Sequence, residues 1–356
     1  MADLGSPTEN PVSLDGSQGE GGGQILRTAL TLSLLTGRPF RMVRVRENRA
    51  TPGLRPQHVK AVEAASLLGD ALVRGNEVGS RELEFQPRRL LPRDLELDIG
   101  TAGSTGLILQ TLQLPLSMRS RTAVRLSLVG GTFNPHAPPY PFLERTWKAY
   151  LAAFGLPIAL TMPKAGFYPR GGGRLEAWIE PACPRSWSAR EQGRLVRLRC
   201  LAGVCNLPDD IAHRMLDQAA KRLAHLEPSA DLILESTRWQ GPGRGAALSL
   251  TADYEAAIPA TFVGLGERGR PSEVVADDAV DQLLNHLAVP QGAVDLHSAD
   301  QILLPLAMAE GASDYTVSQV TEHLRTNAAT IRQFLDREIV IEEATAPAAP
   351  GRVIIA

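Results

Sequence analysis

Residues 12–35, VSLDGSQGEGGGQILRTALTLSLL, combine three local patterns in one short stretch. The first four residues alternate apolar and polar side chains, which is typical of a half-buried strand. Glycines then occupy residues 19–23 except for Glu20, and an apolar run with helical spacing begins after Gln24. The stretch therefore predicts a strand, a glycine loop and a helix, in that order.

The glycine loop indicates an anion site, because residues without Cβ atoms let a phosphate approach the amides of a helix N-terminus closely. The loop is not of the Walker A type, since no Gly-Lys-Ser or Gly-Lys-Thr follows it. Glu20 would repel a bare phosphate, but it could hold a divalent cation that bridges to one. A tight turn with a helix cap is the alternative interpretation.

The same order of elements recurs along the chain. After the first strand and helix, the pattern predicts a strand at 40–46, a helix at 55–68 and two short strands, so the unit has the order βαβαββ. Matching units begin near Leu95 and Val294, and the last of them includes predicted helices at 299–308 and 323–335. Three copies of one supersecondary unit indicate a repeat architecture, with chance spacing as the alternative.

Residues 184–288 interrupt this pattern between the second and third units. A polar linker opens the segment, and predicted strands at 195–204, 231–235 and 246–252 follow among two predicted helices. We therefore expect an α+β fold in which three βαβαββ repeats form a large domain of residues 1–183 and 289–356. A smaller α+β domain, residues 184–288, is inserted between repeats two and three.

The composition excludes several classes of protein. A chain of 356 residues that is 44% hydrophobic and 21% charged is too long for one small core and too balanced to be disordered. A formal net charge of −2 excludes a uniformly basic nucleic-acid binder. Cys183, Cys200 and Cys205 lack Cys-x-x-Cys spacing, so neither a disulfide scaffold nor a structural zinc site is expected. With no secretory pattern and no long apolar run, we expect a soluble cytoplasmic protein without membrane contact.

Arginines cluster after the first helix. Six of them stand between residues 38 and 55 against a single acid, Glu47. The planar guanidinium suits bidentate recognition of phosphate, so the cluster predicts phosphate binding. A solvated strand face is the alternative, because Arg44 and Arg46 flank Val45 as they would on an exposed strand. The arginines are Arg38, Arg41, Arg44, Arg46, Arg49 and Arg55.

The seven histidines show no His-x-x-x-His pair that would indicate a metal site. Three of them fall on the helical patterns of the insertion, where we expect surface or structural roles: His213, His225 and His286. His323 stands at the start of a predicted helix, at the mouth of the third unit. On its position alone, a structural role is the more common one. The remaining histidines are His58, His136 and His297.

Seven segments together resemble the RNA 3'-terminal phosphate cyclase family. They occur in the family's order and span nearly the whole chain, and the first is the most specific. The segments are LDGSQGEGGGQILR at 14–27, RATPGLRPQH at 49–58, TAGS at 101–104, GGTFNP at 130–135, GFYPRGGG at 166–173, ADQ at 299–301 and HLRTN at 323–327.

The resemblance implies both a fold and a reaction. Family members have three βαβαββ units, with a small α+β domain inserted between the second and third. A histidine attacks ATP to form a covalent histidine-AMP adduct, and the AMP passes to an RNA 3'-phosphate. The neighbouring 2'-hydroxyl then releases the AMP and leaves a 2',3'-cyclic phosphate. The resemblance thus implies an enzyme that uses ATP, a divalent metal (Mg or Mn) and RNA with a 3'-terminal phosphate, with its oligomeric state left open.

Matching positions imply roles for individual residues. His323 matches the nucleophile, and Glu20 matches the residue that contacts the metal ion and the ATP. Pro135 and His297 match the two sides of an adenine sandwich, and Asp300 and Gln301 match a pair beside the nucleoside. The polar set around the phosphates of ATP and RNA is matched by Arg27, Arg46, Arg49, Gln57, His58 and Gln110.

Two positions depart from the family pattern. His297 stands where tyrosine is common, and Leu265 stands where the family often has an aromatic residue against the base. We therefore expect weaker stacking on the base, which would raise the dissociation constant of the nucleotide. Two other classes of protein share parts of this fold and are the alternatives. One is a non-catalytic cyclase-like protein of ribosome assembly, and the other is an enolpyruvyl transferase. The presence of His323 and Glu20 argues against the first, and the insertion and the HLRTN segment argue against the second.

Overall fold

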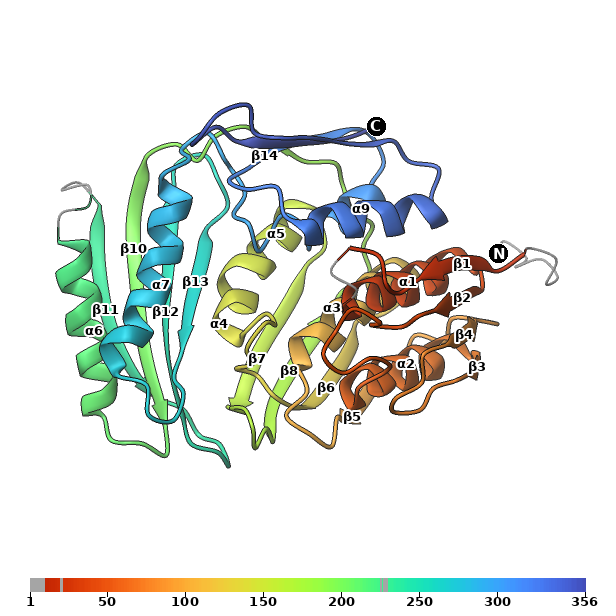
Figure 1. The fold of residues 1–356 in the computed structure, drawn as a ribbon, viewed down its shortest axis with the longest axis horizontal. Helices are drawn as coiled ribbons and strands as arrows, with labels where there is room; N and C mark the ends of the chain where they lie inside the picture. Colours follow the sequence, from red (N-terminus) through yellow and green to blue (C-terminus); the bar gives the residue numbers. More distant parts are fainter. Residues whose placement is uncertain (1–9, 20–21, 225, 227–229) are drawn as a thin grey trace.

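The computed structural model describes residues 10–19, 22–224, 226 and 230–356. Within these residues the chain is a mixed α+β structure whose strands form four separate four-stranded sheets. Figure 1 shows how the labelled helices and strands are arranged. No helix in this part of the chain is both long enough and apolar enough to cross a membrane.

The first sheet has the order β1-β2-β4-β3, in which β1 and β2 are parallel and the other pairs antiparallel. Helix α1 ends at a left-handed residue, Gly37, with φ 75°, whose amide donates to the carbonyl of Ser33 at 2.9 Å. The elements are β1 (Val12–Asp15), α1 (Gly23–Thr36), β2 (Phe40–Val43), α2 (Pro56–Gly69), β3 (Leu72–Arg74) and β4 (Leu83–Gln86).

The second sheet repeats this arrangement, with the order β5-β6-β8-β7 and a parallel β5-β6 pair. The hydroxyl of Ser104 caps α3 by accepting from the amide of Leu107 at 3.3 Å. A π-helical turn at Leu143–Trp147 joins α4 to α5. The elements are β5 (Leu95–Asp98), α3 (Thr105–Arg119), β6 (Val124–Gly130), α4 (Tyr140–Phe142), α5 (Lys148–Ala153), β7 (Ile158–Lys164) and β8 (Gly173–Ile179).

The third sheet has the order β15-β16-β14-β9, and Ser188 and Ala189 of β9 pair in parallel with β14. Thr321 caps α9, because its hydroxyl accepts from the amide of Leu324 at 3.2 Å. The elements are β9 (Ser188–Ala189), α8 (Leu303–Ala307), β14 (Ser313–Val317), α9 (Glu322–Phe334), β15 (Ile339–Glu342) and β16 (Gly351–Ile355).

The fourth sheet has the order β11-β10-β12-β13 and carries its own buried core together with α6 and α7. Stacked Phe133 and Phe167, 4.5 Å between centroids, and Trp239, 4.6 Å from Phe133, join it to the second sheet. The elements are β10 (Leu195–Cys205), α6 (Asp210–Leu223), β11 (Asp231–Arg238), β12 (Gly245–Tyr254), β13 (Ala260–Leu265) and α7 (Ser272–Leu287).

Three sequence-based expectations need correction. The strand expected at 40–46 ends at Val43, because Arg44 and Arg46 adopt left-handed φ values of 51° and 56° in a turn. The helix expected at 299–308 is only Leu303–Ala307, since the Asp295 carboxylate accepts the amides of His297 and Ser298 and holds a turn before it. Strand β13, with a buried aromatic at Phe262, was missed.

Candidate active site

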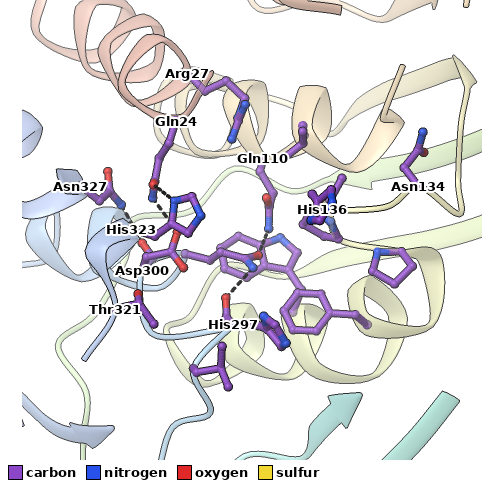
Figure 2. Close-up of a pocket in the computed structure, with 18 of the residues that line it drawn as sticks. Gln24, Arg27, Gln110, Asn134, His136, His297, Asp300, Thr321, His323 and Asn327 are labelled. Atoms are coloured by element: carbon purple, nitrogen blue, oxygen red, sulfur yellow. Dashed lines mark hydrogen bonds between the residues drawn. The ribbon is translucent and has the colours of Figure 1, made fainter. Parts of the chain in front are cut away.

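A cavity of about 860 Å³ lies where α1, α3, β13, α7 and the N-terminus of α9 meet. Helix α1 packs against both α3 and α9, so it forms the centre of one wall. Seven of the residues singled out from the sequence line this cavity: Arg27, Gln110, Pro135, His297, Asp300, Gln301 and His323. Figure 2 shows how several of them point toward one another.

A polar stripe along α1 faces the cavity. Gln24, Arg27, Thr28 and Thr31 all line it, although the helix is otherwise largely apolar and buried. Their spacing of i, i+3, i+4 and i+7 places them on one face of the helix. This stripe was readable in the sequence, and it would have identified Gln24, to which the sequence reasoning assigned no role.

Gln24 joins the proposed nucleophile to a carboxylate. Its amide Nε2 donates to Oδ2 of Asp300 at 2.5 Å, and its Oε1 lies 2.9 Å from Nδ1 of His323 (Figure 2). His323 is exposed at the start of α9, so its ring reaches the cavity. These three side chains come from segments up to 299 residues apart in the sequence.

The electrostatic state of this wall is set mainly by burial. Burial raises the pKa of Asp300 to about 7, although its hydrogen bonds and the Arg27 guanidinium favour the carboxylate. Burial also lowers the pKa of Arg27 to about 10, while Asp300 acts in the opposite direction. Arg27 therefore stays cationic at neutral pH and brings positive charge to the cavity.

Asn327 fixes the position of Asp300 relative to both helices. Its Nδ2 donates to the carbonyl of Asp300 at 2.7 Å, and its Oδ1 accepts from the Thr28 hydroxyl at 2.7 Å. Asn327 belongs to the HLRTN segment but had no role assigned from the sequence. The sequence feature that could have indicated Asn327 is its position one helical turn after His323, on the same face of α9.

The other side of the cavity holds a second chain of amides. Gln110 donates to Gln301, and Gln301 Nε2 donates to the carbonyl of His297 at 2.6 Å. The His297 ring lies 3.0 Å, through Nε2, from Oε1 of Gln282 on α7. Residues 184–288 therefore contribute directly to the cavity wall, through α7 and β13.

Pro135 and His297 both line the cavity, as the proposed base-binding pair requires. Leu265, which stands where an aromatic residue was expected, lines it too. Beside Pro135, Asn134 donates to the carbonyl of Ala102, and His136 has a left-handed φ of 57°. His136 also lines the cavity, although the sequence assigned it no role. The only sequence feature that could have indicated His136 is its position directly after the GGTFNP segment.

A second polar group lies beside the start of α1, outside the residues that line the cavity. A Cβ atom on Gly23 would lie 2.5 Å from Nε2 of His58 and 2.8 Å from Nη1 of Arg27. A Cβ on Gly22 would lie 3.3 Å from Nη2 of Arg49. The glycines thus leave room for these side chains, and Arg27 connects the group to the cavity.

His58 is buried and neutral within this group. Burial lowers its pKa to about 3, and the charges of Arg27, Arg46 and Arg55 add to the effect. The backbone amide of Arg55 donates to its Nδ1 at 3.0 Å, so the ring proton resides on Nε2, which faces Gly23 and Arg27. His58 therefore presents a neutral N–H donor.

Arg46 and Gln57 complete the surroundings of this group. Arg46 donates to the carbonyls of Thr51 and Gly53 at 2.9 and 3.2 Å, and burial, Arg55 and Arg49 lower its pKa. Gln57 lies against the turn that precedes α3. A Cβ atom added to Gly103 in that turn would be 2.9 Å from the Cβ atom of Gln57.

The cluster of six arginines divides into two sets. Arg38 donates to the carbonyls of Gln333 and Phe334, Arg41 pairs with Glu82 at 3.0 Å, and Arg44 pairs with Asp15. These three make surface contacts, which agrees with the alternative of a solvated face at their positions, whereas phosphate binding by the cluster stays a prediction. The second set is Arg46, Arg49 and Arg55, joined by Arg27 from α1. Arg49 and Arg27 lie against Gly22 and Gly23, and the charges of Arg46 and Arg55 act on His58.

The remaining predictions concern the metal and the histidines of residues 184–288. His213 is exposed and His286 is buried against Tyr254 and Phe262, which fits surface and structural roles. Glu20 and His225 lie outside the described residues. Among the residues that are described, no group of three or more His, Cys, Asp or Glu side chains could hold a metal ion.

Comparisons with known proteins agree on one family. The family model described as RNA 3'-terminal phosphate cyclase matches residues 18–341. A relative of that name from Ralstonia nicotianae is 42% identical over 333 residues, 93% of each chain. Another, from Koribacter versatilis, is 40% identical over 94% of this chain and 92% of its own. A third, from Pyrobaculum aerophilum, is 39% identical over 91% of this chain and 92% of its own. The chain therefore belongs to the RNA 3'-terminal phosphate cyclase family.

Proposed function

We propose that this protein is an ATP-dependent enzyme that converts an RNA 3'-terminal phosphate into a 2',3'-cyclic phosphate. The observation that carries the proposal is the position of His323, exposed on a cavity wall with its Nδ1 2.9 Å from Gln24. Family membership supplies the substrate class, since the relatives carry the name RNA 3'-terminal phosphate cyclase.

The reaction would proceed in three displacements at phosphorus. A ring nitrogen of His323 attacks the α-phosphorus of ATP, the bond to the bridging oxygen breaks, and pyrophosphate leaves with that electron pair. A 3'-phosphate oxygen of the RNA then attacks the adenylate, which frees the histidine and gives RNA(3')pp(5')A. Finally, the 2'-hydroxyl attacks the 3'-phosphorus and loses its proton, AMP leaves, and the cyclic phosphate forms.

The surrounding residues would bind and orient the substrates. Pro135 and His297 would take the two faces of the adenine, with Gln110, Asp300 and Gln301 beside the nucleoside. The positive charge of Arg27 supports phosphate binding in the cavity. Around Gly22 and Gly23, Arg46, Arg49, Gln57 and the N–H of His58 would bind phosphate oxygens of ATP and of the RNA terminus.

The proposal includes a divalent ion, Mg or Mn, with Glu20 as its protein ligand and phosphate oxygens as further ligands. When bound, such an ion would share the negative charge of the departing pyrophosphate. Among the protein's own groups, the positive charge of Arg27 would offset the same negative charge.

We also propose that the chain is organised as three βαβαββ repeats, with an insertion at 184–288 and a large domain of residues 1–183 and 289–356. The matching strand orders β1-β2-β4-β3 and β5-β6-β8-β7 support the repeat. The separate core of β10–β13 with α6 and α7 supports an inserted unit.

The direct test is incubation with ATP labelled at the α-phosphate, in the presence of Mg or Mn. We expect a labelled protein adduct that is labile to acid and stable to base, because a phosphoramidate bond has that chemistry. His323→Ala should form no adduct. His213→Ala removes an exposed histidine of α6 that does not line the cavity, and this variant should form the adduct normally.

Product analysis completes the test. An RNA ending in a 3'-phosphate should become resistant to phosphatase when incubated with the wild-type protein and ATP. Absence of an adduct from the wild-type protein would contradict the proposal and favour the non-catalytic alternative. An adduct that survives in His323→Ala would show that another residue is the nucleophile.

A further inference from the structure

Gln192 lies where the chain passes from one sheet to another. Ser188 and Ala189 of β9 still pair with the third sheet, and β10 of the fourth sheet begins at Leu195. In the sequence Gln192 is part of the polar linker that opens residues 184–288. Only 2% of its surface is exposed, so its amide must find hydrogen-bond partners inside the protein.

The side-chain amide of Gln192 holds the segment in which the chain returns from the fourth sheet, after α7. Its Nε2 lies 3.1, 3.0 and 3.1 Å from the carbonyl oxygens of His286, Val289 and Gly292. Carbonyl oxygens only accept hydrogen bonds, so the NH2 group must face them and share its two protons among the three. The last carbonyls of a helix have no intrahelical donor, and Gln192 supplies one at the end of α7.

The backbone of Gln192 makes further contacts at the same place. Its amide donates to the carbonyl of Pro290 at 3.0 Å, and its carbonyl accepts from the amides of Ala256 and Ala257, each at 3.2 Å. These two alanines belong to the turn between β12 and β13. One buried residue therefore joins the segment before β10, the segment after α7 and the turn that leads into β13. We call this arrangement the Gln192 junction.

The segment after α7 is anchored in turn to the third sheet. The amide of Ala293 donates to the Thr316 hydroxyl at 3.1 Å, and the amide of Val294 donates to the Thr316 carbonyl at 3.0 Å. The chain then enters the turn of Asp295 and reaches His297, which lines the cavity. The Gln192 junction is therefore only a few residues along the chain from the cavity wall.

The cavity itself lies between two walls that the Gln192 junction connects. One wall contains the proposed nucleophile, His323, and comes from residues outside 184–288, whereas β13 and α7 supply the other wall. Figure 1 shows β13 next to α4, which it contacts. Hydrogen bonds at the rim join the walls, from Thr146 to Thr261 at 2.9 Å and between His297 and Gln282 at 3.0 Å. The placement of the β13–α7 wall thus depends on these rim contacts and on the Gln192 junction.

We infer that Gln192 is a positioning residue that holds the β13–α7 wall against the rest of the cavity and so sets how tightly the cavity closes on a nucleotide. This inference rests on the proposed function, in which ATP binds in the cavity. His323 stands on the opposite wall, so a looser junction should leave its chemistry intact once ATP is bound. The effect falls on binding, because the apparent dissociation constant rises as the closed arrangement becomes less populated.

The first test measures the Gln192 junction itself, without nucleotide. Hydrogen exchange of segment 286–293 reports the amides of Val289 and Gly292, which donate to the carbonyls of His286 and Val289. Gln192→Met keeps the length of the side chain but removes its donors, and exchange of this segment should become faster by about tenfold.

Met215→Ala is the matched control for both tests. Met215 is fully buried on α6, in the core that α6 and α7 form with the fourth sheet, and it does not line the cavity. Its truncation lowers the melting temperature through lost packing, with no change at the Gln192 junction. Well below that temperature, segment 286–293 should exchange as in the wild type.

The second test follows adduct formation with α-labelled ATP over a range of ATP concentrations. Gln192→Met should raise the half-saturating ATP concentration about tenfold and change the maximal rate less than about twofold. Met215→Ala should leave both values unchanged. Thr316→Val removes the hydroxyl that anchors Ala293, and it should raise the half-saturating concentration about threefold. Thermal unfolding of each variant shows whether it is folded.

The outcomes separate this inference from the proposed function. If the wild-type protein forms no adduct, the proposed function fails, while the exchange test still reports on the junction. If the adduct forms and Gln192→Met keeps the wild-type ATP dependence, the positioning role is overturned. An equal rise in Gln192→Met and Met215→Ala would indicate a general loss of stability and overturn it as well. If Gln192→Met does not fold, unchanged ATP dependence in Thr316→Val overturns the inference.

Discussion

The hydroxyl of Thr28 donates to Oδ1 of Asn327 at 2.7 Å and so joins α1 to α9, although the two residues are 299 positions apart in the sequence. Both residues are buried. Because Asn327 also donates to the carbonyl of Asp300, one amide holds together the two helices and the turn that line the cavity around His323. The geometry of the candidate active site depends on this contact.

Asn327→Ala should lower the free energy of unfolding by about 2 to 3 kcal/mol, because it leaves the Thr28 hydroxyl and the Asp300 carbonyl without a buried partner. Thr28→Val should cost less, since one group is left unpaired. Urea denaturation of both variants and of the double variant gives the coupling energy, which we expect to exceed about 0.5 kcal/mol. Strictly additive effects would show that the contact contributes no stability.

Gly23→Ala should reduce activity at least about tenfold. The new Cβ would lie 2.5 Å from Nε2 of His58 and 2.8 Å from Arg27, so both side chains would have to move. Gly243→Ala is the matched control, because its Cβ would lie at an ordinary contact distance of 3.5 Å from the Cβ of Arg170. Equal activity of the two variants in the adduct assay would contradict the packing described around His58.

His58→Gln should weaken the dependence of the free energy of unfolding on pH. The pKa of His58 is lowered to about 3 by burial and by its arginine neighbours, whereas 6.5 is the ordinary value. The unfolded chain therefore binds the extra proton first, and the stability from the neutral ring is lost as the pH falls from 6.5 toward 3. The slope is about 1.4 kcal/mol per pH unit.

Denaturation at several pH values between 4 and 7.5 measures this slope for the wild type and for His58→Gln. Part of the slope should remain, since burial also lowers the pKa of His286. His213→Gln removes an exposed histidine and serves as the control. An unchanged slope in His58→Gln would mean that the ring does not change its ionisation on unfolding.

Arg49→Ala and Arg46→Ala should lower kcat/KM for RNA ending in a 3'-phosphate by about 10- to 150-fold. This range corresponds to about 1.5 to 3 kcal/mol for a hydrogen bond to a charged group. Arg74→Ala is the control, because that side chain is 86% exposed and lies 3.6 Å from Glu84 on the first sheet. Single-turnover kinetics would identify the step affected, and wild-type values for Arg46→Ala and Arg49→Ala would reject the assignment to phosphate.

Local patterns in the sequence predicted most of the elements that carry the site. The strand, glycine loop and helix of residues 12–35 correspond to β1 and α1, and the helix expected at 323–335 is α9. They failed where a local side chain redirected the backbone. The helix expected at 299–308 begins only at Leu303, because the Asp295 carboxylate accepts a backbone amide in the preceding turn. The strand expected at 40–46 ends before Arg44, because Arg44 and Arg46 adopt left-handed backbone angles.

The amino-acid sequence fixes which chemical groups are available: a histidine at the start of a helix, arginines near a glycine loop, a polar stripe on an otherwise apolar helix, and the order of these groups along the chain. Which of them come into contact depends on the three-dimensional packing of the helices and sheets. Helical and strand periodicity describe neighbours a few residues apart, whereas the contacts of Gln24 with His323 and Asp300 arise from helix packing across almost the whole chain.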